Sequence, residues 1–217
     1  MTVQKALKAA LRDILGPCAR SHGFNGSAPT WRKSTSSGDW AVVNVQSSSF
    51  SSAEHLQCVI NLAVAPEPWL RWTRVKLGAA MPKSVTENLG LYRERLHPGG
   101  TAAGQDGWWE ITDAASAVSA VEDMVGQLDV AGWPVIEQLL RREGMLEQVR
   151  TGGLGHWKQP SAGVFLARAE ALLLMDGGPS PALDERLQYA LENCTPQQRE
   201  HGVEFDAWVR DQANLTH

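Results

Sequence analysis

The sequence predicts an α+β fold: a mostly antiparallel four- to five-stranded sheet with helices packed on one face, followed by an α-helical C-terminal extension. Three observations support this fold class. Apolar and polar residues alternate between positions 40 and 64, which is typical of a hairpin. The chain opens with apolar residues spaced three and four apart, and the same helical period returns after residue 113. Helices grouped before and after a block of strands indicate an α+β protein.

The first helix is expected from Val3 to Leu15, because the apolar residues of this segment fall on one helical face. Gly16-Pro17 is expected to end it. A short strand, Thr30–Lys33, is then predicted before the turn at residues 36–39, which is made of Ser, Gly and Asp.

Strands 40–46 and 55–64 are predicted to form a hairpin in which Gln46 pairs with His55. This register gives one apolar face, with Ala41, Val43 and Val45 opposite Ile60, Cys58 and Leu56. On the other face Trp40 meets Asn61, Val42 meets Val59, and Asn44 meets Gln57. The apolar face is expected to pack under helices and the amide-rich face to stay uncovered.

Two interpretations stay open for residues 66–82: a short helix or a long excursion bounded by prolines. Ser84 and Glu87 match a capping box, so a short helix ending at Gly90 is predicted next. A strand from Leu91 to Leu96 follows, and it directs Arg93 and Arg95 to the same side. Another strand, 108–112, is expected to place Trp109 and Ile111 in the core and Trp108 on the exposed side.

The rest of the chain is expected to be helical. A helix after Asp113 carries the apolar stripe Val118, Val121, Val125 and Leu128, and Pro134 is expected to open a second helix that runs through Val149. Residues 151–163 are the predicted linker between an α+β domain, 1–150, and a helical extension, 151–217. Helices are predicted in the extension at 165–175, after Ser180-Pro181, and after Thr195-Pro196 with Gln198 completing a capping box.

Charge is distributed unevenly along the chain. Residues 1–100 hold 12 Lys and Arg and 6 Asp and Glu, whereas residues 101–217 hold 8 and 18. We expect the two halves to attract each other within one fold. The alternatives are a polyanionic partner for the basic half or a basic partner for the acidic half, but the Lys and Arg residues form no run of the kind that nucleic-acid-binding segments carry.

The three cysteines, Cys18, Cys58 and Cys194, lie far apart and form no C-x-x-C pair for zinc or a redox disulfide. A reducing cytoplasm is therefore the expected location. The N-terminal segment lacks the apolar core of a signal peptide, and nowhere do about 18 apolar residues run together as a membrane span requires. We expect a soluble protein without a membrane partner.

The motifs of common catalytic and cofactor sites are absent from the sequence. There is no dinucleotide-binding or phosphate-binding glycine loop, no nucleophile elbow, and no pair of histidines at metal-binding spacing. The sequence thus predicts no cofactor, no metal ligand set and no catalytic residue. One alternative is acid–base chemistry at His55 with Glu110 and the two arginines; the other is that His55 is a polar residue at a strand end.

The uncovered sheet face is the predicted binding surface. Trp and Arg are enriched in interface hot spots, and amides add donors and acceptors without a desolvated charge. The alternative is that the C-terminal helices fold over this face and satisfy it internally. The predicted surface consists of Trp40, Asn44, Gln46, His55, Gln57, Asn61, Arg93, Arg95 and Trp108.

Several stretches together resemble a bacterial family catalogued as a domain of unknown function, numbered forty-three-oh-four, over roughly residues 1–130. They are "GF" after the first helix, "WAVVNVQSSSFSS", "CVINLAV", "YRERL" and "DGWWEI". The resemblance implies a small α+β unit and a strand at 91–96. It implies no activity or catalytic residue, and the helices beyond residue 150 fall outside it.

Contact chemistry without a catalytic group favours a non-enzymatic interaction module, an immunity-like or accessory factor that binds a protein or peptide and that could also form a homo-oligomer. The alternative is an enzyme acting on a phosphorylated or sugar-like small molecule, in which the arginines bind an anion and a Trp stacks on the substrate. Binding of nucleic acid by the basic half is the least favoured function.

Overall fold

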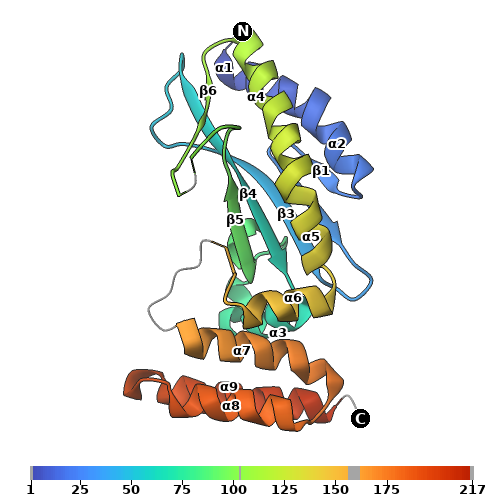
Figure 1. Cartoon of the computed structure of the whole chain (residues 1–217), viewed down its shortest axis with the longest axis vertical. Coiled ribbons are helices and arrows are strands. Elements are labelled where there is room, and N and C mark those ends of the chain that lie inside the picture. Colours follow the sequence, from blue (N-terminus) through green and yellow to red (C-terminus); the bar gives the residue numbers. More distant parts are fainter. Residues whose placement is uncertain (1, 103, 156–161, 216–217) are drawn as a thin grey trace.

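The computed structural model, which describes residues 2–102, 104–155 and 162–215, confirms an α+β fold built on an antiparallel sheet (Figure 1). The path β1-β2-β3-β4-β5 runs across the sheet, and β6 pairs with β4 beside β5. The central strand β4 is buried on both faces for most of its length. The strands are β1 (Asn25–Ser27), β2 (Thr30–Ser34), β3 (Trp40–Ser47), β4 (Leu56–Ala65), β5 (Tyr92–Leu96) and β6 (Trp109–Ile111).

Helices cover one face of the sheet, and further helices stack at one end of it (Figure 1). The covering helices are α1 (Val3–Ala10), α2 (Gly16–Ser21), α4 (Ala114–Gln127) and α5 (Trp133–Leu139). At the end of the sheet lie α3 (Glu67–Leu77), α6 (Arg142–Arg150), α7 (Ala162–Leu174), α8 (Pro181–Glu192) and α9 (Arg199–Asn214). In the described ranges, every helix is too short or too polar to cross a membrane.

The hairpin register differs from the predicted one by four residues, although the two faces were assigned correctly. Asn44 pairs with Asn61 instead of Gln57, and Trp40 pairs with Ala65. The error arose because β4 is apolar at every core-facing position, so an even shift keeps the core face apolar. The serine-rich loop decides the register: Ser48 N–H donates to Gln57 O, and the Ser51 hydroxyl also bonds to Gln57.

Neither predicted helix break at a proline occurs. At Gly16-Pro17 the chain forms a π-helical turn, Leu11–Leu15, and continues directly into α2. A second π-helical turn, Leu128–Gly132, joins α4 to α5 just before Pro134. Each π-helical turn holds one residue more than an α-helical turn. We infer that this wider turn accommodates the proline ring, which would clash with the preceding turn of a regular α-helix. The real break in the second helix lies at residues 140–141.

The segment between α3 and β5 is less helical than predicted. Residues 66–82 do hold a helix, α3, but the helix predicted up to Gly90 is only a 3₁₀ turn, Glu87–Leu89. The segment lies flat on the sheet instead: a Cβ on Gly90 would lie 2.7 Å from the Cβ of Ala63. Close packing therefore explains this glycine, which has extended backbone angles rather than those of a left-handed helix cap.

Most of the remaining element predictions are confirmed. Trp109 and Ile111 are buried and Trp108 is partly exposed, as the strand pattern predicted. The Asp113 cap of α4 forms, as does the capping box of Thr195 and Gln198. Val118 does not belong to the buried stripe, because the core side of α4 is made by smaller side chains and by Met124: the buried set is Ala117, Ala120, Val121 and Met124.

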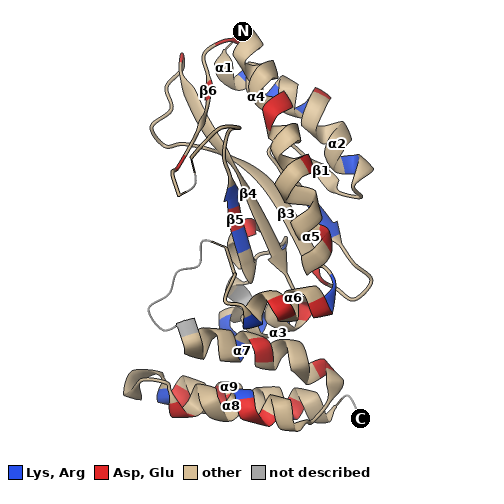
Figure 2. Ribbon diagram, in the orientation of Figure 1, with Lys and Arg blue, Asp and Glu red and all other residues tan. Residues whose placement is uncertain are grey.

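The C-terminal helices dock on the end of the sheet through aromatic and ionic contacts. The rings of Trp69 and Phe165 lie 5.7 Å apart, which joins α3 to α7. Buried Glu170 accepts a hydrogen bond of 2.7 Å from Arg150, which joins α7 to α6. Figure 2 shows acidic residues on α6 to α9. The separation into domains 1–150 and 151–217 stays a prediction, and residues 156–161 of the predicted linker lie outside the described part of the chain.

A buried carboxylate, Asp39, connects the hairpin to these helices. One carboxylate oxygen accepts hydrogen bonds from the backbone N–H of Glu67 (2.8 Å) and from Arg142 (3.3 Å). The other accepts from the Ser37 hydroxyl at 2.7 Å. Asp39 is 5% exposed, so these bonds satisfy a charge that is shielded from water. They tie the turn before β3 to the start of α3 and to α6.

We therefore expect Asp39→Ala to lower the free energy of unfolding by about 3 kcal/mol, because it leaves Arg142 without its buried partner. Urea unfolding followed by circular dichroism measures the change. Asp13→Ala is the matched control: Asp13 forms a fully exposed pair with Arg12 and should leave the unfolding midpoint unchanged. Equal midpoints for the two variants would contradict the role of Asp39.

Candidate functional site

The sheet face opposite the covering helices has one covered end and one open end. At the covered end Leu89, Met81 and Val85 pack against Ala65 and Leu70. The opposite end carries polar residues from β3, β4 and β5, and the C-terminal helices do not extend over it (Figure 1). We call this end the polar patch; it consists of Gln46, Gln57, Asn61, Arg95 and Trp108.

Asn61 lies at the centre of the polar patch. Its Nδ2 donates to Gln46 Oε1 at 2.7 Å, and its Oδ1 accepts from Arg95 Nε at 3.4 Å. The side chain therefore bridges β3 and β5 across the central strand. Because Asn61 is only 6% exposed, it positions its neighbours and offers little surface of its own.

Arg95 is the cation of the polar patch, and neighbouring side chains hold its guanidinium in place. Its guanidinium lies 5.7 Å from the centre of the Trp108 ring and 3.9 Å from the Asp106 carboxylate, in addition to the bond to Asn61. The side chain is 31% exposed, so part of it still reaches solvent. A guanidinium held over an indole is well placed to bind a carboxylate or a backbone carbonyl.

His55 and Glu110 lie at the edge of the polar patch, in solvent. His55 Nε2 is 3.7 Å from Glu110 Oε2, and Gln57 donates to the other Glu110 oxygen at 3.3 Å. The two side chains are 45% and 62% exposed. This is the geometry of a solvated surface pair, without the burial that tunes a catalytic acid or base.

Two residues of the predicted surface lie apart from the polar patch, and a third, Arg93, lies next to it on β5, opposite Ala63. Trp40 packs in the apolar cluster at the covered end, and Asn44 Nδ2 donates to Thr30 Oγ1 at 2.8 Å within the sheet. Arg93 forms a parallel bridge with Gly155, and its N–H donates to Leu154 O at 3.4 Å. The four-residue change in register accounts for Trp40, which now lies opposite Ala65 beneath the 81–90 segment.

A cavity of about 640 Å³ opens beside β5, next to Arg95. Sequence reasoning treated this region only as a loop, although the run of Gly and Pro after residue 97 is typical of functional loops. His97 is held there by a bond of 2.9 Å between Nδ1 and Gly107 O. The lining includes Glu94, Arg95, His97, Thr101, Asp106 and Gln127.

A second cavity, of about 310 Å³, lies between α1, α2 and the β1–β2 edge. Basic side chains line it, namely Lys5, Lys8, Arg12 and Arg20. Trp31 also lines it; this residue is 1% exposed, and its Nε1 finds no acceptor among the described residues. The spacing of the first three basic residues, at positions 5, 8 and 12, places them on one helical face and is a signal visible in the sequence.

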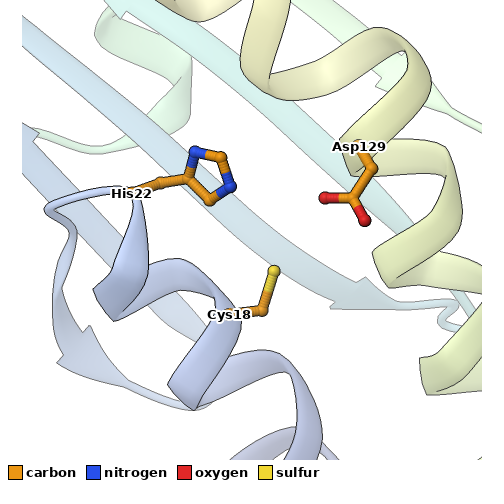
Figure 3. Close-up of side chains that lie close together, drawn as sticks. All are labelled: Cys18, His22 and Asp129. Atoms are coloured by element: carbon orange, nitrogen blue, oxygen red, sulfur yellow. The ribbon is translucent and has the colours of Figure 1, made fainter.

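The structure also gathers Cys18, His22 and Asp129, whose possible ligand atoms lie within 4.8 Å of one another (Figure 3). Burial, reinforced by the charge of Asp129, raises the pKa of the Cys18 thiol. Burial alone raises the pKa of Cys58 to about 12, so that thiol is inert. The sequence prediction weighed pairs of histidines and C-x-x-C pairs and missed the Cys-x-x-x-His spacing at 18 and 22, which places both side chains on one helical face.

The family comparison covers most of the sheet and the helices over it. Residues 15–138 match the family model described as Domain of unknown function (DUF4304), and the chain belongs to that family. The match ends within α5, so α6 to α9 lie beyond it. No curated protein and no solved structure matches the chain.

The bridging position of Asn61 predicts that Asn61→Ala lowers the free energy of unfolding by about 1–2 kcal/mol, because Gln46 and Arg95 both lose a partner. Gln57→Ala is the matched control. The Gln57 side chain donates one hydrogen bond, to the exposed Glu110 carboxylate, so this variant should change the free energy of unfolding by less than about 0.5 kcal/mol. Urea unfolding of both variants measures the difference. A smaller effect at Asn61 than at Gln57 would show that the bridge does not hold.

Proposed function

We propose that this member of the DUF4304 family is a non-enzymatic interaction module that binds an extended segment of a partner protein at the polar patch and the adjoining edge of β5. Such a module suits an accessory or immunity-like factor. We place it in the cytoplasm, because its free cysteines, Cys18, Cys58 and Cys194, suit a reducing compartment.

The observation that carries this proposal is the fixed position of Arg95. Three neighbours hold the guanidinium, so a partner that binds it loses little side-chain entropy. Arg and Trp lie together here, and these two residue types dominate the energetics of many interfaces. The amides of Gln46 and Gln57 surround them with donors and acceptors for a polypeptide backbone.

The edge of β5 offers a second mode of contact. Arg93 N–H bonds to Leu154, away from β4, and alternation along the strand directs the N–H of Arg95 to the same side. Among the described residues, that N–H donates at 2.9 Å only to the adjacent Glu94 side chain, which can rotate away. An extended partner segment can therefore add to the edge beside Arg95, as peptides do in β-augmentation.

The double variant Arg95→Ala/Trp108→Ala tests the proposal. We expect it to lower partner binding at least about tenfold, since each residue has the character of an interface hot spot. Affinity capture from the source cells identifies the partner, and titration calorimetry with the purified partner measures the affinity. Arg199→Ala, at an exposed position on α9, is the matched control and should bind as the unchanged chain does.

Circular dichroism of the double variant checks that the fold is retained. Unchanged affinity in a folded double variant would exclude the polar patch as the binding surface. If binding falls with salt as steeply as it does for nucleic-acid-binding proteins, and nucleic acid is captured, binding of nucleic acid by the basic half would be favoured instead.

The basic cavity favours one other function, binding of a phosphorylated small molecule. Its four basic side chains supply charge for an anion, and the buried Trp31 N–H lacks a protein acceptor in the described ranges. The site is separate from Arg93 and Arg95, where the sequence placed anion binding. An enzyme of this kind would still need an acid or base near the cavity.

We expect glucose 6-phosphate, but not glucose, to raise the melting temperature of the unchanged chain, because ligand binding to the folded state stabilises it. The variant Lys8→Ala/Arg20→Ala should lose this rise. Lys83→Ala, exposed and outside the cavity, is the matched control and should keep it. No rise with millimolar glucose 6-phosphate in the unchanged chain would contradict binding at this cavity.

A further inference from the structure

Two helical segments meet beside the sheet and bring three different ligand types together. Cys18 lies in α2, His22 is the residue that ends α2, and Asp129 lies in the π-helical turn between α4 and α5. Figure 3 shows a ring nitrogen of His22 and the sulfur of Cys18 on the side that faces the Asp129 carboxylate. Their possible ligand atoms all lie within 4.8 Å of one another.

Thiolate, imidazole and carboxylate are the donors that zinc takes in proteins. Around a tetrahedral zinc ion, neighbouring ligand atoms are about 3.3–3.6 Å apart, as the usual bond lengths require. The three side chains therefore need to close by little more than about 1 Å, which rotation about their side-chain bonds provides. Spacing of four residues on one helix is also how helical motifs aim two ligands at one ion.

Neighbouring residues already orient two of the three side chains. Trp133 Nε1 donates to Asp129 Oδ1 at 3.1 Å, and Trp133 itself is 3% exposed. The His22 ring stacks on the Trp133 ring with 4.6 Å between centres, and His22 Nδ1 lies 3.7 Å from Glu137 Oε1. Partners of this kind fix the orientation of ligands in metal sites.

We propose that Cys18, His22 and Asp129 bind one zinc ion, with the fourth coordination position filled by water. Access is open, because Asp129 is exposed and the His22 side chain is 31% exposed. The ion joins α2 to the turn between α4 and α5, and so links the N-terminal and central parts of the helical layer. The site lies on the helical layer, whereas the polar patch lies on the opposite face of the sheet, and the two proposals stand independently.

The experiment uses the full chain, without an affinity tag, reduced and treated with a chelator. We expect it to bind one equivalent of zinc in competition with a fluorescent zinc indicator. Cobalt should give a thiolate-to-metal charge-transfer absorption, since the ligand set contains one sulfur. Zinc should also raise the melting temperature, because the folded state alone brings the three ligands together.

Cys18→Ser should abolish the charge-transfer absorption, and His22→Gln and Asp129→Asn should each lower zinc affinity at least tenfold. Cys194→Ser and His201→Gln are the matched controls, since both residues lie in the C-terminal helical region and outside the cluster. If Cys18→Ser fails to fold, the two other variants, at more exposed positions, decide the question. The proposal is wrong if the unchanged chain binds less than one equivalent, if the absorption persists in folded Cys18→Ser, or if the controls lose affinity equally.

Discussion

The carboxylate of Asp39 is the contact on which the arrangement of the whole molecule depends. It lies at the turn before β3 and bonds to the first residue of α3 and to Arg142 of α6. Arg142 also lies 3.7 Å from Asp176, which pairs with Arg71 of α3. This chain of charges holds the helices after the family domain at the end of the sheet. They lie there and do not extend over the amide-rich face (Figure 1).

The two faces of the sheet consequently differ in what covers them. The face under α1, α2, α4 and α5 contains the main core, with side chains such as Ile60, Leu62 and Ile111 fully buried. On the other face the 81–90 segment covers one end, and Val59 and Asn61 of β4 are buried there as well. What remains open there is a small set of polar side chains bonded to one another across three strands. A preorganised set of this kind loses little side-chain entropy on binding, which supports our proposal that it recognises a polypeptide.

Alternation along the strands was enough to predict the fold class and to sort residues such as Asn61 and Val43 to their faces, because side-chain direction has a period of two. The register of β3 against β4 could not be predicted from the sequence. Every core-facing position of β4 is apolar, so several registers fit equally well, and the hydrogen bonds that decide between them lie in the loop after Ser47. For the same reason Trp40 could not be recognised as part of a covered cluster. The site of Cys18 and Asp129 joins residues more than a hundred positions apart, and only the helical spacing to His22 was visible beforehand.

The two π-helical turns have a consequence for how this chain tolerates changes in length. Each turn contains one residue more than an ordinary α-helix would need, and each stands just before a proline. Deleting a single residue between Leu11 and Leu15 would remove the extra residue and restore the common helical pitch, and the residues downstream would keep their helical faces. The ring of Pro17 would then collide with the preceding turn. Insertions and deletions should accordingly be rarer in these two turns of related chains than in the serine-rich loop.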